Sequence, residues 1–161
     1  MKLFVRVIEA RNLRGIDFNG LSDAYVKLKV GKQKFKTKVV KKIVNPSSGE
    51  DFSFRVEDLK EKLRIYVLNK NKYFNDDFMG KLKISIWKIF DVENKFLETT
   101  WYSLQPKNKK SKNKDYGEIR VAISLSLNNS SFEESPSGSP NDALNTDKYP
   151  VIHHLFHYGH L

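Results

Sequence analysis

Apolar and polar residues alternate through most of the first 127 positions, and this period of two constrains the fold more than any other property of the chain. Successive side chains of a β-strand point to opposite faces of a sheet, so the alternation predicts strands with one buried face. The segments with this pattern are 3–8, 25–30, 33–39, 52–56, 63–67, 82–86, 101–104 and 119–127.

Turn-forming residues separate these eight segments. Gly31-Lys32 allows a tight turn, and the stretches 45–49 and 106–117 are rich in turn residues. Short strands divided by turns are typical of β-sandwiches. We therefore predict an all-β fold, an eight-stranded antiparallel β-sandwich. The connection between Ile86 and Trp101 leaves room for a short helix at Trp87 to Phe90.

The composition changes at Asn128. Residues 128–147 are mostly Asn, Ser, Pro, Gly and acidic residues, a composition too polar to order itself against a core. A chain of 161 residues has the length of one domain. We expect a β-sandwich domain over 1–127 and a low-complexity, disordered C-terminal tail over 128–161.

Several function classes have little support in the sequence. The chain has no cysteine, and its four histidines all lie within the last nine residues. The predicted domain therefore contains neither histidine nor cysteine, and it has no Gly-x-Ser-x-Gly motif and no Gly-rich loop that could cradle a phosphate, so we do not expect an enzyme. No apolar stretch is long enough to cross a bilayer, and the N-terminus is too charged for a signal peptide. We expect a cytoplasmic protein.

The positive charge is concentrated in the predicted domain. Residues 1–127 contain 28 Lys and Arg residues against 15 Asp and Glu residues. A domain this basic is expected to bind something anionic, such as nucleic acid, an acidic protein or a membrane rich in anionic lipid.

The charge is densest between Val26 and Lys42, where eight of 17 residues are lysine and none is acidic. If segments 25–30 and 33–39 form a hairpin, the odd positions of the first and the even positions of the second share one face of the sheet. The opposite face, which includes Phe35, would supply core residues. The shared face carries Lys27, Lys29, Lys34, Lys36 and Lys38.

Two interpretations of this lysine face remain open. Lysines also keep exposed edge strands soluble, so a solvated surface is one of them. Like charges on neighbouring strands repel each other, however, and an anionic ligand relieves that repulsion. The aromatic residue of the hairpin, Phe35, alternates toward the core, so no platform for base stacking is expected and nucleic acid is not the predicted ligand.

Three motifs resemble those of C2 domains. They are LFVRVIEARNLRGIDFNGLSDAY at 3–25, NKNKYFNDDFMGK at 69–81 and GEIRVAIS at 117–124. The resemblance covers about residues 1–127 and is closest to the N-terminal C2 domains of plant proteins in which a C2 domain precedes a GRAM domain. It implies a C2-like β-sandwich, in agreement with the alternation.

The resemblance also implies a calcium site built from two loops at one end of the sandwich. Its five aspartate positions fall on Asp17, Asp23, Asn69, Asn71 and Asp77, so two are asparagine and the charge drops from −5 to −3. Calcium affinity depends strongly on ligand charge, so we expect calcium binding to be weak or absent. The remaining aspartates would then cap their own loops, as turn aspartates commonly do.

C2 domains that do not rely on calcium often bind phosphoinositides or phosphatidylserine through a lysine-rich face equivalent to this hairpin. The resemblance therefore implies a peripheral membrane-targeting module, cytoplasmic and recruited to anionic phospholipid. Apolar residues at the predicted loop tips, Phe18, Leu21, Tyr73 and Phe74, are suited to shallow membrane insertion. The alternatives are a protein interaction module that uses the same face against an acidic partner, and residual calcium-dependent phospholipid binding.

Overall fold

The computed structural model describes residues 1–14, 23–38, 47–108 and 115–127. All strand pairs in this part of the chain are antiparallel, so the predicted all-β, eight-stranded antiparallel fold is confirmed. The elements are β1 Lys2–Arg11, β2 Ala24–Val30, β3 Gln33–Lys36, β4 Ser47–Arg55, β5 Lys62–Asn69, β6 Asp77–Ser85, α1 Ile86–Phe90, β7 Phe96–Ser103 and β8 Glu118–Ser126.

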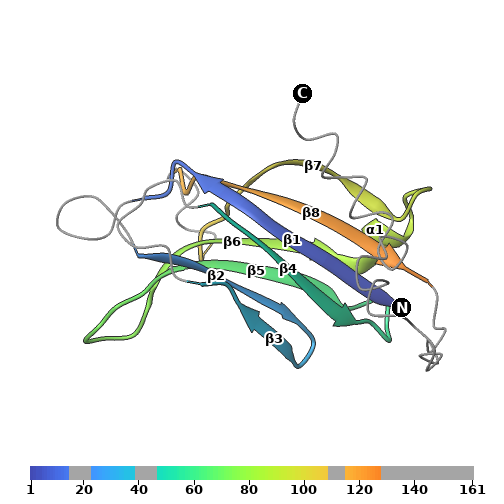
Figure 1. Cartoon of the computed structure of the whole chain (residues 1–161), viewed down its shortest axis with the longest axis horizontal. Helices are drawn as coiled ribbons and strands as arrows, with labels where there is room; N and C mark the ends of the chain where they lie inside the picture. Colours follow the sequence, from blue (N-terminus) through green and yellow to red (C-terminus); the bar gives the residue numbers. More distant parts are fainter. Residues whose placement is uncertain (15–22, 39–46, 109–114, 128–161) are drawn as a thin grey trace, which may run out of the picture.

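The strands form two four-stranded sheets that pack face to face (Figure 1). One sheet has the order β4-β1-β8-β7 and the other β3-β2-β5-β6. Alternate side chains of both sheets fill the space between them, and Val5, Leu28 and Ile65 are fully buried there. The apolar face of most strands is therefore used as the alternation predicts, although Phe4, Ala122 and Ser124 on the other face of the β4-β1-β8-β7 sheet are buried as well.

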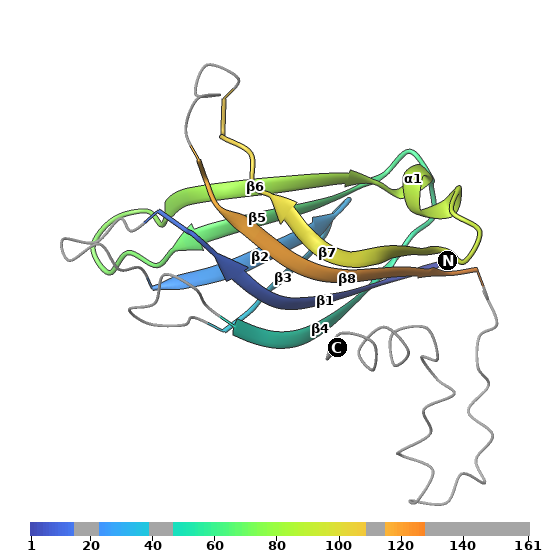
Figure 2. The same ribbon diagram turned by 90° about the horizontal axis from the view of Figure 1, so that it is seen from above.

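The connection between β5 and β6 lies at the end of the sandwich where β1 ends and β2 begins (Figures 1 and 2). The backbone N–H of Lys70 donates to the carbonyl of Asp23 across 2.8 Å, which ties the two regions together. The helix α1 and the N-terminus lie at the opposite end (Figure 1). The β5–β6 connection and the lysine hairpin therefore belong to one continuous sheet, β3-β2-β5-β6.

The hairpin differs from the prediction in its second strand. β3 ends at Lys36, because the Thr37 side chain enters the ladder: its hydroxyl accepts the N–H of Val26 at 2.9 Å. The prediction that Phe35 belongs to the core was wrong. Its side chain is 40% exposed and contacts the rings of Phe52 and Phe54 at the open edge of the sandwich.

Other boundaries also moved. Strand β7 starts at Phe96, five residues before the predicted segment 101–104. The short helix α1 lies in the connection where the sequence left room for it. No helix among the described residues has the length and apolar character needed to cross a membrane. β8 ends at Ser126, and the predicted tail, 128–161, lies outside the described residues.

Candidate functional site

The register of the hairpin places its lysines directly opposite one another. Lys27 pairs with Lys36 and Lys29 with Lys34, across the two-residue turn Gly31-Lys32. The alternating residues of β2 are buried, so these lysines lie on the outer face of the sheet. The structure thus brings together four of the five lysines singled out from the sequence.

Each of these two lysine pairs continues as a row of outward side chains across β5 and β6, which the sequence reasoning did not anticipate. Strand β2 pairs with β5, and β5 with β6, in the register that adds three cationic residues and one tyrosine to the outer face. The two rows, here called the cationic face, are Lys34, Lys29, Arg64 and Lys83, and Lys36, Lys27, Tyr66 and Lys81.

The charges of the two sheets are arranged differently. On the other sheet, arginines pair with acids: Arg6 with Asp51 at 2.6 Å, and Arg120 with Glu9 at 3.4 Å. Strands β2, β3 and β5 contain no acidic residue, and no lysine of β2 or β3 forms an ion pair with a described acid. The positive charge of the hairpin lysines is therefore concentrated rather than neutralised.

Two more lysines border this face. Lys38 does not belong to either row, because it lies beyond the end of β3. Its backbone N–H donates to the carboxylate of Glu50 at 2.9 Å. On the far side, the ammonium of Lys81 donates to the carbonyl of Lys107 at 3.3 Å. The beginning of the second lysine-rich segment is thus adjacent to the cationic face, although 109–114 lie outside the described residues.

Asn69 links the loop ends through both atoms of its side-chain amide. It is 1% exposed. Its Oδ1 accepts the backbone N–H of Asp23 at 2.8 Å, and its Nδ2 donates to the Asp77 carboxylate at 3.2 Å. An amide N–H therefore lies against a carboxylate at two of the positions for which the sequence resemblance implies calcium ligands.

Asn71 shapes the tip of the β5–β6 connection. Its side-chain oxygen accepts the backbone N–H groups of Tyr73 at 3.0 Å and Phe74 at 3.2 Å, which is an Asx-type turn. The side chains of Tyr73 and Phe74 are 81% and 80% exposed. Of the four expected insertion residues, these two are presented to solvent at the loop tip, while Phe18 and Leu21 lie outside the described residues.

These contacts bear on whether calcium fits the site. The side-chain oxygens of Asn69 and Asn71 already accept backbone N–H groups, and Asn69 also brings a donor to Asp77. Among the described residues, which do not include Asp17, no three His, Cys, Asp or Glu side chains are grouped to hold a metal. Calcium requires about six to eight oxygen ligands, and in the described part of the chain the side-chain oxygens of Asn69 and Asn71 are instead engaged in hydrogen bonds within the protein.

Asp76 connects the loop to the start of the cationic face. The Tyr25 hydroxyl donates to its carboxylate, as does the backbone N–H of Asn71 at 3.0 Å, and the Lys70 ammonium lies 3.9 Å away. The bond from Tyr25, followed by that from Asn71, lowers the pKa of Asp76. Burial, with the bond to Asp76 and its charge, raises the pKa of Tyr25 to about 12.

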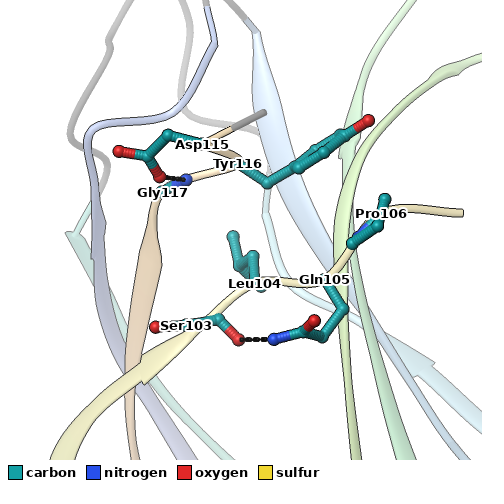
Figure 3. A pocket seen from close by; sticks show the side chains of 7 residues that line it. All are labelled: Ser103, Leu104, Gln105, Pro106, Asp115, Tyr116 and Gly117. Carbon is teal, nitrogen blue, oxygen red and sulfur yellow. Dashed lines mark hydrogen bonds between the residues drawn. The ribbon is translucent and has the colours of Figure 1, made fainter. Parts of the chain in front are cut away.

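A separate hollow of about 410 Å³ lies between the ends of β7 and β8 (Figure 3). Its one carboxylate, Asp115, accepts the backbone N–H of Gly117 at 2.8 Å, and Gln105 donates to the Ser103 carbonyl at 3.4 Å. The other lining residues are Leu104, Pro106 and Tyr116. The Asp115 carboxylate and the Gln105 amide are therefore both engaged by backbone groups of their own loops.

Comparisons with known sequences agree with the fold. The C2 domain family matches residues 1–104. A C2 and GRAM domain-containing protein of Arabidopsis thaliana is 53% identical over 143 residues, covering 89% of this chain and 14% of that protein. Rabphilin-1 of Caenorhabditis elegans is 33% identical over 143 residues, covering 81% and 13%. This chain thus spans about a seventh of the length of these relatives.

Solved structures agree with this result. A C2 domain of plant extended synaptotagmin 1 superposes with a TM-score of 0.64 at 24% identity, covering 78% of this chain and 95% of that one. A calcium-bound pair of C2 domains from extended synaptotagmin 2 also gives 0.64, at 28% identity, covering 76% and 44%. Human GIVD cytosolic phospholipase A2 gives 0.62 at 28% identity, covering 76% of this chain but 16% of the enzyme. The chain therefore belongs to the C2 domain family.

Proposed function

We propose that this C2 domain is a peripheral membrane-binding module for anionic phospholipid, either phosphoinositide or phosphatidylserine. The observation that carries the proposal is the direct opposition of Lys27 with Lys36 and of Lys29 with Lys34. Like charges in cross-strand pairs destabilise a sheet, and bound anions remove that cost. Each lysine close to an anionic leaflet contributes about 1 kcal/mol, which is enough for reversible recruitment when several act together.

The loop tip adds an apolar contribution. Tyr73 and Phe74 are exposed at the end of the same sheet. Their backbone is held by the Asn71 side-chain oxygen, which accepts the N–H groups of both residues. Aromatic side chains favour the boundary between headgroups and acyl chains. We assign shallow insertion to this tip, and the same role to Phe18 and Leu21, which lie outside the described residues.

Calcium dependence is proposed to be weak or absent. The side-chain amide of Asn69 donates to the Asp77 carboxylate and accepts the backbone N–H of Asp23, and the Asn71 oxygen accepts backbone N–H groups of its own loop. The chain is proposed to act by binding and not by catalysis, because its cationic face presents charge to an anionic surface. We place it in the cytoplasm, peripherally associated with membranes.

Vesicle co-sedimentation of the full chain tests this function. Neutral, phosphatidylserine and phosphoinositide vesicles are compared in calcium and in chelator, at about 0.1 M and about 1 M salt. We expect binding to both anionic vesicles in chelator, weakened by salt because the Debye length falls from about 10 Å to about 3 Å. Equal binding to neutral vesicles, or binding only with calcium, would contradict the proposal. Failure to bind any vesicle would favour an acidic protein as the ligand of the same face.

A further inference from the structure

Phe4 is buried although it projects from the outer face of the sheet β4-β1-β8-β7. Its neighbours Leu3 and Val5 point into the sandwich, and Phe4 itself is 9% exposed. Ala122 on β8, which pairs with Arg6, lies on the same outer face and is also buried. Neither Phe4 nor Ala122 belongs to the cluster of side chains that fills the space between the two sheets. A second apolar area therefore exists on this outer face.

Four residues define this area, here called the outer apolar patch. Phe4 pairs with Ser124 on β8, and Ser124 pairs with Phe96 on β7, so one row places a small residue between two rings. Ala122 lies beside Ser124 on the same face of β8. Because neighbouring strands are about 4.8 Å apart, the two rings project from strands about 10 Å apart. The residues of the patch are Phe4, Phe96, Ala122 and Ser124.

The neighbouring side chains on β4 and β8 are too small to bury the ring of Phe4. On both strands the residue opposite Phe4 is a serine, Ser53 on β4 and Ser124 on β8. Arg6, the next outward residue of β1, is bonded to Asp51 at 2.6 and 2.7 Å. No described helix or strand lies over this face (Figures 1 and 2). The burial of Phe4 thus indicates a covering segment outside the described residues.

Three segments outside the described residues are connections at the far end of the sandwich. Each joins strands at the end where β1 reaches Arg11, because β4 begins at Ser47 opposite Glu9, and β8 begins at Glu118 opposite Arg11. Arg11 lies about 23 Å from Phe4 along β1. A segment of eight residues extends to at most about 29 Å, so it cannot reach Phe4 and return. These segments are 15–22, 39–46 and 109–114.

The chain that follows β8 begins beside the patch. β8 ends at Ser126, which pairs with Lys2, so this part of the chain starts about 7 Å from Phe4 along the strands. Its first stretch, 128–148, is rich in Asn, Ser, Pro and acidic residues. Its last stretch, 149–161, contains no Lys, Arg, Asp or Glu. Four large apolar side chains lie between the two tyrosines of 149–161, those of Val151, Ile152, Leu155 and Phe156.

We propose that the outer apolar patch binds residues 149–161 of the same chain. Burial of apolar surface on both sides stabilises such a contact, and the segment brings no charged side chain that would have to be desolvated. For this segment, the proposal replaces the expectation of a disordered tail.

The length of the intervening stretch, 128–148, allows this contact. A chain of about 21 residues has a mean end-to-end distance of about 25 Å, which exceeds the distance from the end of β8 to Phe4. A linker of this length holds the segment at millimolar effective concentration, so the segment is favoured over a second copy of the chain at micromolar concentration. The patch and the cationic face lie on opposite outer faces of the sandwich, so the proposed lipid site stays open and the two proposals are independent.

Disulfide capture in the full chain tests the position of the segment, because the unmodified chain contains no cysteine. His154→Cys is combined either with Ser53→Cys, next to Phe4, or with Ser103→Cys at the far end of the same sheet. Both serines are exposed. In dilute oxidised glutathione, the pair with Ser53→Cys should form an intramolecular disulfide at least about tenfold faster than the pair with Ser103→Cys. Circular dichroism on heating verifies that each variant is folded.

Two matched double substitutions test the energetic contribution of the segment. Leu155→Ser with Phe156→Ser removes two apolar side chains from 149–161. The control, Phe132→Ser with Leu144→Ser, removes the same two residue types from 128–148. We expect the melting temperature of the full chain to fall by about 3 °C or more for the first pair and to change by less than about 1 °C for the control. Neither melting temperature should depend on protein concentration, because the contact is intramolecular.

Three results would overturn the inference. Equal rates of disulfide formation for the two cysteine pairs would show that the segment does not lie at the patch. Equal changes in melting temperature for the two double substitutions would show that 149–161 makes no contact of its own. Disulfide-linked dimers, together with a melting temperature that rises with protein concentration, would assign the patch to a second copy of the chain.

Discussion

The side-chain amide of Asn69 donates a hydrogen bond to the carboxylate of Asp77, with 3.2 Å between Nδ2 and Oδ2. The other atom of the same amide accepts the backbone N–H of Asp23. One uncharged side chain therefore joins the ends of two connections and supplies a hydrogen-bond donor to a carboxylate. This contact gives the loop end of the domain a cross-link that does not depend on metal.

Restoring the two carboxylates should restore a calcium response. In Asn69→Asp with Asn71→Asp, both acceptor roles are kept, but Asp77 loses its donor and faces a second carboxylate. We expect the free energy of unfolding in chelator to fall by about 1 to 3 kcal/mol, because the carboxylates repel each other and lack partners. Calcium should then raise the melting temperature of this variant, since a ligand that binds only the folded state stabilises it.

The unmodified chain is the control for that experiment. Its melting temperature should be the same in calcium and in chelator. A calcium-induced rise as large in the unmodified chain as in the variant would show that the asparagines do not prevent binding, and the interpretation of the loop would be wrong.

Replacing the exposed loop tip should weaken membrane binding without loss of stability. Tyr73→Ser with Phe74→Ser keeps the backbone N–H groups that Asn71 accepts and removes two rings that are about four-fifths exposed. Because these rings make little contact in the folded chain, the free energy of unfolding should change by less than about 0.5 kcal/mol. Because the variant cannot partly bury these two rings in the bilayer, we expect its vesicle affinity to fall about tenfold.

The matched control is Trp87→Ser, which removes a 55% exposed ring from α1 at the opposite end of the sandwich. We expect its vesicle affinity to equal that of the unmodified chain. Equal losses from the two replacements would mean that exposed aromatic area, and not the loop tip, drives the interaction.

Tyr25 should make the domain less stable at alkaline pH. Its folded pKa is about 12, against an ordinary value of 10.0. The unfolded chain therefore loses this proton first, so the stabilisation is complete below pH 10 and is lost as the pH rises to about 12. We expect urea unfolding to show Tyr25→Phe less stable than the unmodified chain at pH 8, with the gap narrowing by about 1 kcal/mol at about pH 11. A gap that stays constant with pH would contradict the assignment.

The strands could be predicted from the sequence because their alternation is regular and their buried faces are apolar. Phe35 was misplaced by the same rule. It alternates with the lysines as a core residue should, but β3 is an edge strand of four residues, and the ring lies against Phe52 at the open side of the sandwich. Periodicity identifies which face a residue takes and does not identify how far that face is covered.

The proposed binding surface could be predicted only in part. The pairing of Lys29 with Lys34 follows from a tight hairpin, whose register the local sequence determines. The addition of Arg64 depends on the order β3-β2-β5-β6, in which strands distant in sequence become neighbours. The outward positions on β5 and β6 were visible in the alternation, but their partners were not. The contacts of the Asn69 amide depend on side-chain orientation, which residue spacing does not determine.

Binding of the lysine face to anionic membranes without calcium is the property to test first. The most direct measurement is the affinity of the full chain for phosphatidylserine vesicles in chelator. The first double variant carries Lys34→Glu and Lys36→Glu. The second, a control of equal charge change, carries Lys2→Glu and Lys88→Glu. Both control lysines are exposed and lie outside the cationic face, on β1 and α1. We predict at least about a tenfold loss for the first pair and at most about a threefold loss for the control. Equal losses would reduce the interaction to net charge, and no loss from the first pair would contradict the proposed role of the lysine face.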